Sequence, residues 1–475
     1  MSGLVSLVGA GPGNAEWLTV LGHRRLSAAD VIIYDRLVDP ALLSPYTADK
    51  INVGQLPYRH KISQAEINEL MVNLAKKGQR VVRLKAGDPN VFGRGGEEAQ
   101  YLKAQHVAFE VVPGLTSAIA GLAAAGIPIT SDQATSFHVI TGHRRANGQT
   151  LDWANIAHQE GTLVFVMGME NLETLTTQLI INGMPRATPA AVVQWATQWR
   201  QRAIASDLGH LVNVVQRGKL AAPALIVVGQ VVNFMGRLTP KPPLQGLHLL
   251  VPYKAGSKLF SALQDEGASV NCFDRRIKNP LPVQLPDLTT GGTLVITDFA
   301  AMPFFLQQLH TKGLDIRALS NWKLLAMNHI VKYRLQTLGL MADGLYDPQR
   351  IDPRRPIVLI GEQERLATYH VPVKVTYLPT YESVAVDQPL NLKEFHGVVF
   401  PSSQSVADLY LSCGEFMRAE LRHMPCFAMG QVVADECQKL GLRHVILVNP
   451  SYDSVIQTVK KTLRSVDDGA QTQLS

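Results

Sequence analysis

The sequence predicts an α/β fold with largely parallel sheets, built as two successive two-lobed halves. Short β-branched runs alternate with helical patterns along the first half, which is typical of βαβ units. A proline-rich stretch, residues 237–246, separates this half from the rest. The second half contains an internal repeat. A chain of 475 residues has room for about three or four domains of ordinary size.

Alternating strands and helices define the first half, residues 1–236. A helix of small residues is predicted at 117–125, because Thr116 precedes it and Gly126 and Pro128 end it. This helix lies near the middle of the half, so we expect lobes at about 1–113 and 114–236. The predicted strands are 5–8, 31–34, 81–84, 109–112, 138–141, 163–167, 191–194 and 225–228.

A repeat organises the second half, residues 247–465. Residues 325–340 resemble residues 427–442, and a predicted strand and helix precede each copy. Two further apolar runs, 247–251 and 357–360, are each expected to open a unit. We therefore expect two related α/β lobes, followed by a polar, frayed tail at 466–475.

Composition excludes several classes of protein. No apolar run approaches 18 residues, so no membrane span is expected, and the start lacks the cationic lead of a signal peptide. The four cysteines form no CxxC pair and have no zinc spacing, which indicates reduced thiols in a cytoplasmic protein and no metal site. The net charge of +6 suits nucleic acid or a small polyanion, but no aromatic-rich or helix-turn-helix pattern favours nucleic acid.

The loop at residues 83–98 is the most informative stretch. It follows an apolar strand and places several glycines beside Arg and Asp, a pattern that lets backbone approach a ligand. The alternative is a tight turn into a helix, with Glu97 and Glu98 favoured at its positive end. We interpret it as a ligand loop.

Two further features stand at predicted strand ends. Residues 8–14 form a glycine loop, but Asn14 replaces the third glycine of a dinucleotide fingerprint and Pro12 interrupts it. Asp35 ends a strand, where α/β proteins bind ligands. It could equally cap a helix or pair with Arg36.

Together these residues resemble the uroporphyrinogen-III C-methyltransferases of the tetrapyrrole methylase superfamily, over residues 4–233. The resemblance implies S-adenosylmethionine bound between two lobes, S-adenosylhomocysteine as product, and a homodimer formed through this half. The matching segments are 8–13, 29–38, 83–98, 112–118, 126–130, 166–168 and 223–229.

The resemblance also implies the site. Asp35 matches the family's proposed base, whereas Gln55 stands where a lysine proton donor is usual, with Lys61 nearby. Ala86 and Asn14 are smaller departures in the same cleft. The implied cofactor residues are Pro12, Gly87, Asp88, Val91, Thr116, Ser117, Met167, Ala196 and Ala224. A polycarboxylate substrate favours a basic cleft mouth, with Arg36, Arg83, Lys85, Arg94, His143 and Arg144 as candidates. Gln55 is a further, uncharged candidate for binding the substrate.

The second half resembles uroporphyrinogen-III synthases, through residues 378–382, 399–403, 428–432 and 440–442. Pro401 and Val433 fall near positions where that family usually has Thr. Tyr381 matches a family tyrosine proposed to assist loss of the substrate hydroxyl; the alternative is a tyrosine that packs between lobes. Ser403 and Lys254 are weaker candidates.

The two resemblances support each other, because the product of the second half is the substrate of the first. They predict an enzyme that cyclises hydroxymethylbilane to uroporphyrinogen III and methylates it twice to precorrin-2, for sirohaem or cobalamin. One alternative keeps the methyltransferase and makes the second half a non-catalytic, tetrapyrrole-binding or dimerising domain. Others are a methylase of a later corrin intermediate and a nicotinamide-dependent oxidoreductase.

Overall fold

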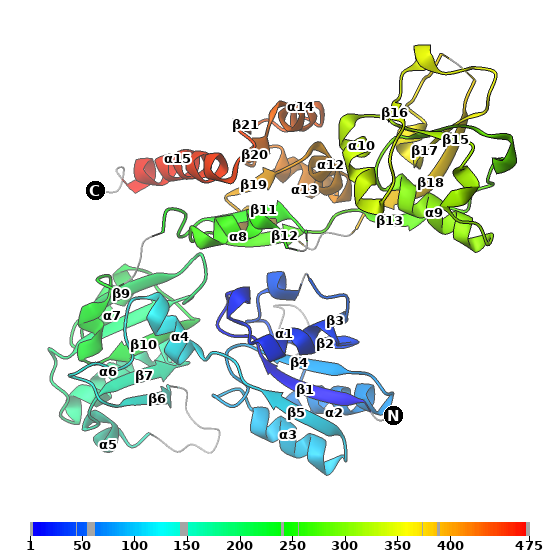
Figure 1. Ribbon diagram of the computed structural model, residues 1–475. Coiled ribbons are helices and arrows are strands. Elements are labelled where there is room, and N and C mark those ends of the chain that lie inside the picture. Colours follow the sequence, from blue (N-terminus) through cyan, green and yellow to red (C-terminus); the bar gives the residue numbers. More distant parts are fainter. Residues whose placement is uncertain are drawn as a thin grey trace. The chain divides into compact units, whose positions relative to one another are not determined.

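The computed structural model describes residues 3–43, 45–54, 62–142, 151–238, 242–254, 256–372, 374–386 and 390–471. These residues form four sheets, which can be followed by their labels in Figure 1. Contacts divide the chain into two compact units. The first is Met1–Phe273, Leu390–Val406 and Ala419–Ser475, and the second is Asp274–Pro389 and Ala407–Arg418. The predicted α/β class is confirmed.

The first sheet is entirely parallel, in the order β3-β2-β4-β1-β5. Its central strands β1 and β4 are almost entirely buried, and they are mainly apolar except for Arg83 and Lys85 of β4. The carboxyl ends of β1, β2 and β4 therefore lie side by side. The strands are β1 (Leu4–Gly9), β2 (Val31–Tyr34), β3 (Asp49–Asn52), β4 (Val81–Lys85) and β5 (Ala108–Val112), and the helices are α1 (Val20–Ser27), α2 (Gln64–Lys76) and α3 (Gly95–Ala104).

The second sheet is mixed, in the order β6-β7-β10-β8-β9, and only β6 and β7 are parallel. Strand β9 was not predicted, and neither was β3 of the first sheet, because both are edge strands with polar residues and are half exposed or more. The small-residue helix is α4 (Ser117–Ala124), one residue shorter than predicted. The other elements are β6 (Phe137–Thr141), β7 (Thr162–Val166), β8 (Pro189–Gln194), β9 (Arg202–Asp207), β10 (Ala224–Val228), α5 (Trp153–Ala157), α6 (Leu172–Ile181) and α7 (Leu211–Arg217).

The third sheet is parallel, in the order β12-β11-β19-β20-β21, and draws strands from both ends of the second half. Helix α15 continues to Gln471, into the segment predicted as a frayed tail. The elements are β11 (His248–Pro252), β12 (Ser269–Phe273), β19 (Gly397–Phe400), β20 (Cys426–Met429), β21 (Val445–Val448), α8 (Lys258–Asp265), α12 (Ser403–Ser412), α13 (Glu415–Leu421), α14 (Gln431–Lys439) and α15 (Tyr452–Gln471).

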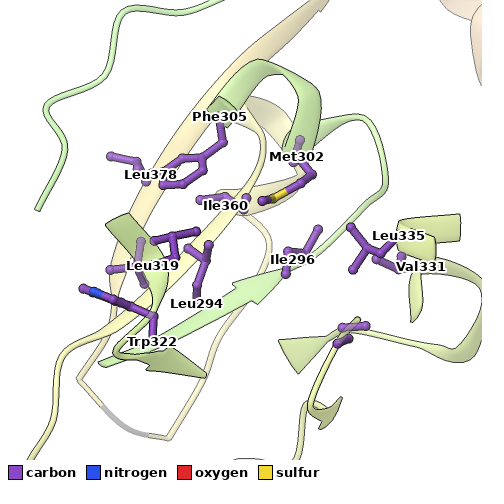
Figure 2. Packing of buried hydrophobic residues seen from close by; sticks show 14 of the residues in the cluster. Leu294, Ile296, Met302, Phe305, Leu319, Trp322, Val331, Leu335, Ile360 and Leu378 are labelled. Atoms are coloured by element: carbon purple, nitrogen blue, oxygen red, sulfur yellow. The ribbon is translucent and has the colours of Figure 1, made fainter. Parts of the chain in front are cut away.

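The fourth sheet has the order β13-β18-β17-β14-β15-β16, with only β13 antiparallel to its neighbour. Figure 2 shows its core, where Met302 and Phe305 of α9 pack on Leu294 and Ile360 of the sheet. The elements are β13 (Ile277–Pro280), β14 (Gly292–Ile296), β15 (Trp322–Ala326), β16 (Gly344–Leu345), β17 (Ile357–Glu362), β18 (Thr376–Val384), α9 (Ala301–Thr311), α10 (His329–Leu335) and α11 (Gln363–Leu366).

This topology corrects the predicted order of the repeat. Residues 357–360 do not open a unit, because β17 lies between β14 and β18 in the fourth sheet. The repeated segments nevertheless correspond, since β14 pairs with β15 in one sheet and β19 pairs with β20 in the other, both in parallel. The repeat is therefore a strand-helix-strand unit, and one sheet is inserted into the chain of the other. Among the described residues, no helix is long and apolar enough to cross a membrane.

Candidate functional site

Three glycine loops meet at the carboxyl edge of the first sheet. Gly11 and Gly87 exchange two backbone hydrogen bonds, of 3.1 Å from the Gly11 nitrogen and 2.8 Å from the Gly87 nitrogen. A Cβ atom on Gly114 would stand 2.7 Å from the Cα atom of Gly9, closer than side chains tolerate. We call Gly9, Gly11, Gly87 and Gly114 the glycine junction. Close backbone contacts require glycine at Gly9 and Gly114, and φ angles of +74° and +72° favour it at Gly11 and Gly87.

Polar groups fix the loops around the glycine junction. Asp88 accepts hydrogen bonds from the backbone nitrogens of Gly114 (3.0 Å) and Asn90 (2.8 Å). Thr116 begins α4, and its hydroxyl oxygen accepts from the nitrogen of Ala118 at 3.4 Å. The missing Cβ of Gly87 would face the Cα of Thr116 at 3.8 Å. The predicted cofactor residues Gly87, Asp88, Thr116 and Ser117 are thus brought together, with Pro12 in the adjoining loop.

The second lobe supplies the remaining cofactor candidates. A Cβ on Gly121 of α4 would lie 2.8 Å from the Cβ of Ala196, so Ala196 adjoins the helix that starts at Ser117. Leu225 of β10 pairs with Val166 of β7 in antiparallel register. Ala224 and Met167 are the next residues along these two strands, so they lie side by side where the strands end. Met167 is 54% exposed and has a φ angle of +56°, a conformation that non-glycine residues rarely adopt.

Asp35 directly follows β2 and faces a buried arginine. Its Oδ1 atom lies 2.7 Å from a terminal nitrogen of Arg83. Arg83 is only 2% exposed, and its Nε atom lies 3.4 Å from Oε1 of Glu98, which Lys85 also contacts at 2.8 Å. Burial and the charge of Arg83 lower the pKa of Lys85, while the carboxylate of Glu98 acts in the opposite direction.

The environment of Arg83 and Lys85 differs from the exposed cleft mouth that was predicted for them. Both were expected to bind substrate carboxylates at the cleft mouth, but both are buried and paired with protein carboxylates. Sequence reasoning also missed Glu98, which it interpreted only as a residue of the first helical turn. Glu98 is fully buried. The only signal in the sequence that could have indicated an ionic partner for Glu98 is the pair of basic residues on the preceding strand.

The other basic candidates are exposed or lie outside the described residues. Arg36 is exposed, and a Cβ on Gly54 would stand 2.6 Å from its Cβ. The side chain of Arg94 is 59% exposed and pairs with Glu97 at 3.0 Å. These two arginines remain available to anionic groups. Gln55, Lys61, His143 and Arg144 lie outside the described residues.

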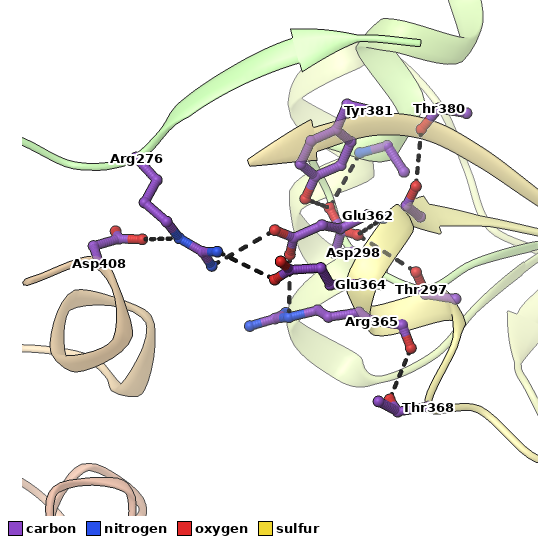
Figure 3. Close-up of polar contacts among 12 residues, drawn as sticks. Arg276, Thr297, Asp298, Glu362, Glu364, Arg365, Thr368, Thr380, Tyr381 and Asp408 are labelled. Carbon is purple, nitrogen blue, oxygen red and sulfur yellow. Dashed lines mark hydrogen bonds and ion pairs between the residues drawn. The ribbon is translucent and has the colours of Figure 1, made fainter. Parts of the chain in front are cut away.

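A second polar cluster lies in the fourth sheet (Figure 3). The hydroxyl of Tyr381 donates to Oδ1 of Asp298 at 2.9 Å, and Asp298 also accepts from the backbone nitrogens of Ala301 (3.2 Å) and Glu362 (3.3 Å). Tyr381 is 2% exposed and stacks on Phe304. Burial, and then the charge of Asp298, raise the pKa of Tyr381 far above its usual range, so the phenol remains a hydrogen-bond donor.

Arg276 joins three carboxylates in the same unit. It lies 3.3 Å from Asp408, 3.3 Å from Glu364 and 3.6 Å from Glu362, with its side chain only 7% exposed (Figure 3). The sequence marks Arg276 only as part of a basic pair. The weaker candidates Lys254 and Ser403 lie elsewhere, each after the carboxyl end of one of the paired strands β11 and β19.

Comparison with known proteins identifies similar families and relatives. Residues 4–212 match the family described as Tetrapyrrole (Corrin/Porphyrin) Methylases. The chain is 32% identical to the porphyrin biosynthesis protein HemD of Ruminiclostridium josui, covering 96% of this chain and 97% of that protein. It is 36% identical to the uroporphyrinogen-III C-methyltransferase of Bacillus subtilis, covering 86% and 87%.

A solved structure resembles the first half. It is the uroporphyrin-III C-methyl transferase from Thermus thermophilus complexed with S-adenyl homocysteine, 37% identical to this chain. The match covers 49% of this chain and 99% of that one, with a TM-score of 0.43.

Proposed function

Because the chain belongs to the uroporphyrinogen-III C-methyltransferases of the tetrapyrrole methylase family, we propose that it converts hydroxymethylbilane to precorrin-2. The second half would cyclise hydroxymethylbilane to uroporphyrinogen III. The first half would methylate that product twice, using S-adenosylmethionine, which supplies a methyl group carried on a positively charged sulfur. The observation that carries the proposal is Asp35, held by Arg83 at the same sheet edge as the glycine junction.

The residues at this edge fit S-adenosylmethionine. The glycine junction leaves backbone without side chains, and the exposed apolar side chains of Val91 and Met167 suit a flat aromatic base. We propose that Pro12, Gly87, Asp88, Val91, Thr116, Ser117, Met167, Ala196 and Ala224 hold the cofactor. Orientation of two bound reactants and exclusion of water then supply most of the acceleration.

Asp35 is proposed to manage the proton. Forming a carbon–carbon bond at a pyrrole carbon leaves an excess proton on the macrocycle, and a carboxylate beside it can accept that proton. Arg83 holds Asp35 from the buried side, with a separation of 2.7 Å. Arg36 and Arg94 are exposed and are proposed to bind substrate carboxylates.

The proposed synthase activity rests on weaker support. The relative that covers nearly the whole chain is named a porphyrin biosynthesis protein. Ring closure of a reactive linear tetrapyrrole mainly needs a confined geometry, so few fixed residues are required. Lys254 and Ser403, at one edge of the third sheet, are the exposed or half-buried candidates for binding substrate.

One observation favours the alternative, in which the second half is not catalytic. A catalytic Tyr381 would have to reach substrate, but its hydroxyl is buried and committed to Asp298. In that alternative the second half binds tetrapyrrole or promotes dimerisation. A homodimer formed through the first half is part of both versions, and sedimentation equilibrium of the full chain tests it.

The test supplies fresh hydroxymethylbilane and methyl-labelled S-adenosylmethionine to the purified full chain without oxygen. A doubly methylated type III product is expected. Label that appears only when uroporphyrinogen III is added, together with unlabelled type I product otherwise, would favour the non-catalytic second half. An Asp35→Asn variant should methylate far more slowly, at a rate that can still be measured, but retain ring closure, which separates the two activities. Absence of label from either substrate would overturn the methyltransferase proposal.

A further inference from the structure

A network of charged side chains, most of them buried, connects helix α3 to Asp35. Glu98 of α3 is fully buried, and its Oε1 atom accepts from Lys85 Nζ (2.8 Å), from Gln64 Nε2 (3.0 Å) and from Arg83 Nε (3.4 Å). A terminal nitrogen of Arg83 then donates to Asp35 at 2.7 Å. One carboxylate therefore stands at each end of the same guanidinium.

The two carboxylates at the ends of this network differ in their exposure to solvent. Glu98 is 0% exposed, whereas the side chain of Asp35 is 34% exposed. The other terminal nitrogen of Arg83 points at the backbone oxygens of Ile33 and Leu84, at 3.4 Å each. The guanidinium is thus held on all sides by fixed groups, and Asp35 is its only partner on the exposed side among the described residues.

From this geometry we propose that Glu98 is a positioning residue for methyl transfer, acting through Arg83 to hold the carboxylate of Asp35 in place. The inference rests on the proposed function of Asp35 as the base. Arg83 and Lys85 together carry two positive charges, and Glu98 and Asp35 carry two negative charges. The net charge of these four side chains is therefore zero. The guanidinium is planar and rigid, so contacts that fix its Nε and one terminal nitrogen also fix the direction from which the other terminal nitrogen meets Asp35.

Loss of the Glu98 charge would disturb Asp35 without touching it. In a Glu98→Gln variant the Nε atom of Arg83 loses its charged acceptor on the buried side, so the guanidinium is no longer fixed in the direction of Asp35. A displacement of about 1 Å at a reacting group lowers a rate by roughly 100-fold. Binding of S-adenosylhomocysteine depends on the glycine junction and should not change.

The experiment is a double-mutant cycle in the full chain. Methylation of uroporphyrinogen III is measured for wild type, Glu98→Gln, Asp35→Asn and the pair. We expect Glu98→Gln to lower kcat by roughly 100-fold, with both KM values within about two-fold of wild type. In the Asp35→Asn background the same change should cost less than about three-fold, because the group it positions is already gone.

Two further variants separate positioning from folding. Glu110→Gln removes another half-buried carboxylate from the same sheet, one that pairs with Arg25 and Ser6 rather than with Arg83 or Lys85, and should retain kcat. Lys85→Met combined with Glu98→Gln restores the charge balance, so it should fold normally and still show the reduced kcat.

The outcomes distinguish this inference from the proposed function. An inactive wild type overturns both. An active wild type with Glu98→Gln at wild-type kcat overturns the positioning role alone. Additive losses in the double-mutant cycle, or a charge-balanced double variant with wild-type kcat, would mean that Glu98 only stabilises the lobe.

Discussion

The hydroxyl of Tyr381 donates to the Oδ1 atom of Asp298 across 2.9 Å, joining β18 to the residues that start α9. Asp298 also accepts from the backbone of Ala301 and Glu362, so one carboxylate ties together two strands and a helix. A buried phenol without this acceptor would be costly. The pair is therefore a structural element of the fourth sheet, whatever further role the tyrosine has.

Replacing Tyr381 with Phe should destabilise the second unit by about 1–3 kcal/mol, the range for a hydrogen bond to a charged group. Faster hydrogen exchange of peptides from β18 and α9 would report this loss. Tyr377→Phe is the matched control on the same strand, because Tyr377 donates to the backbone oxygen of Tyr369 and is 39% exposed. Loss of ring closure in Tyr381→Phe with unchanged exchange would instead indicate a catalytic phenol.

Replacing Gly114 with Ala should weaken cofactor binding. The new Cβ would lie 2.7 Å from the Cα of Gly9, so the loops of the glycine junction must separate. We expect at least about a ten-fold rise in the Kd of S-adenosylhomocysteine, or roughly 1.4 kcal/mol, measured by titration calorimetry. Gly96→Ala is the control, since nothing lies within 4 Å of that Cβ and alanine favours a helix. Equal affinity of both variants would contradict the junction's role.

Replacing Met167 with Gly should stabilise the second lobe and lower the rate of methylation. Relief of the φ angle of +56° should raise the free energy of unfolding of the second lobe by about 1 kcal/mol. Methylation should nevertheless slow, because the exposed thioether is proposed to contact the cofactor. Lys219→Gly, at a φ angle of +51° in the turn after α7, should give similar stabilisation with wild-type methylation. A fully active Met167→Gly would remove Met167 from the site.

Acid should loosen the first lobe through Glu110. The hydrogen bond from Arg25 lowers the pKa of Glu110, and its charge and Ser6 act in the same direction. Because the folded pKa lies below the unfolded value, the pair stabilises the lobe above the unfolded pKa, and this stabilisation is lost as pH falls through the folded pKa. Protection of β5 from hydrogen exchange should therefore fall as the pH drops below the ordinary glutamate pKa of about 4.3.

The Glu110→Gln variant is the test of that cause. It should show less protection of β5 near neutral pH and a smaller change on acidification. Glu69→Gln, an exposed glutamate on α2, should keep the wild-type pH dependence. Identical acid profiles for wild type and Glu110→Gln would assign the effect to other carboxylates.

Thiol labelling should distinguish the cysteines. Burial raises the pKa of Cys413 to about 11 and that of Cys437 to about 12, and Cys426 is raised further. Because the thiolate is the reactive form, these three should resist alkylation near pH 8 in the folded chain. Cys272, which is half buried, should be labelled first. Mass spectrometry of the labelled peptides checks the order, and early labelling of Cys426 would indicate local opening.

Sequence patterns predicted the strands and loops of the first half well, because buried parallel strands are continuous apolar runs and glycine loops have few alternative uses. Asp35 could be placed at a strand end for the same reason. The partner of Arg83 could not be predicted, since an arginine within a strand looks the same whether it meets a substrate or a buried glutamate. Glu98 carries no periodic signal that separates it from Glu97.

The order of strands in the second half was harder to predict. The similarity between residues 325–340 and 427–442 identifies a strand-helix-strand unit but does not say which sheet each strand joins. Pairing between strands that are far apart in the sequence decides which sheet each strand joins. Strand β17 pairs with β14 and β18, and its local sequence pattern does not indicate these partners. The edge strand β9 was missed because its residues are largely polar.

The interrupted third sheet has a consequence for synthesis. Leu249 of β11 pairs with Gly397 of β19, so this side of β11 is synthesised long before its partner, whereas β12 follows soon and pairs with the other side. The strands of the fourth sheet, between Ile277 and Val384, are all made in that interval and can pair among themselves. An unpaired parallel edge is a template for aggregation. The open side of β11 therefore stays unpaired until β19, which ends at Phe400, has been synthesised.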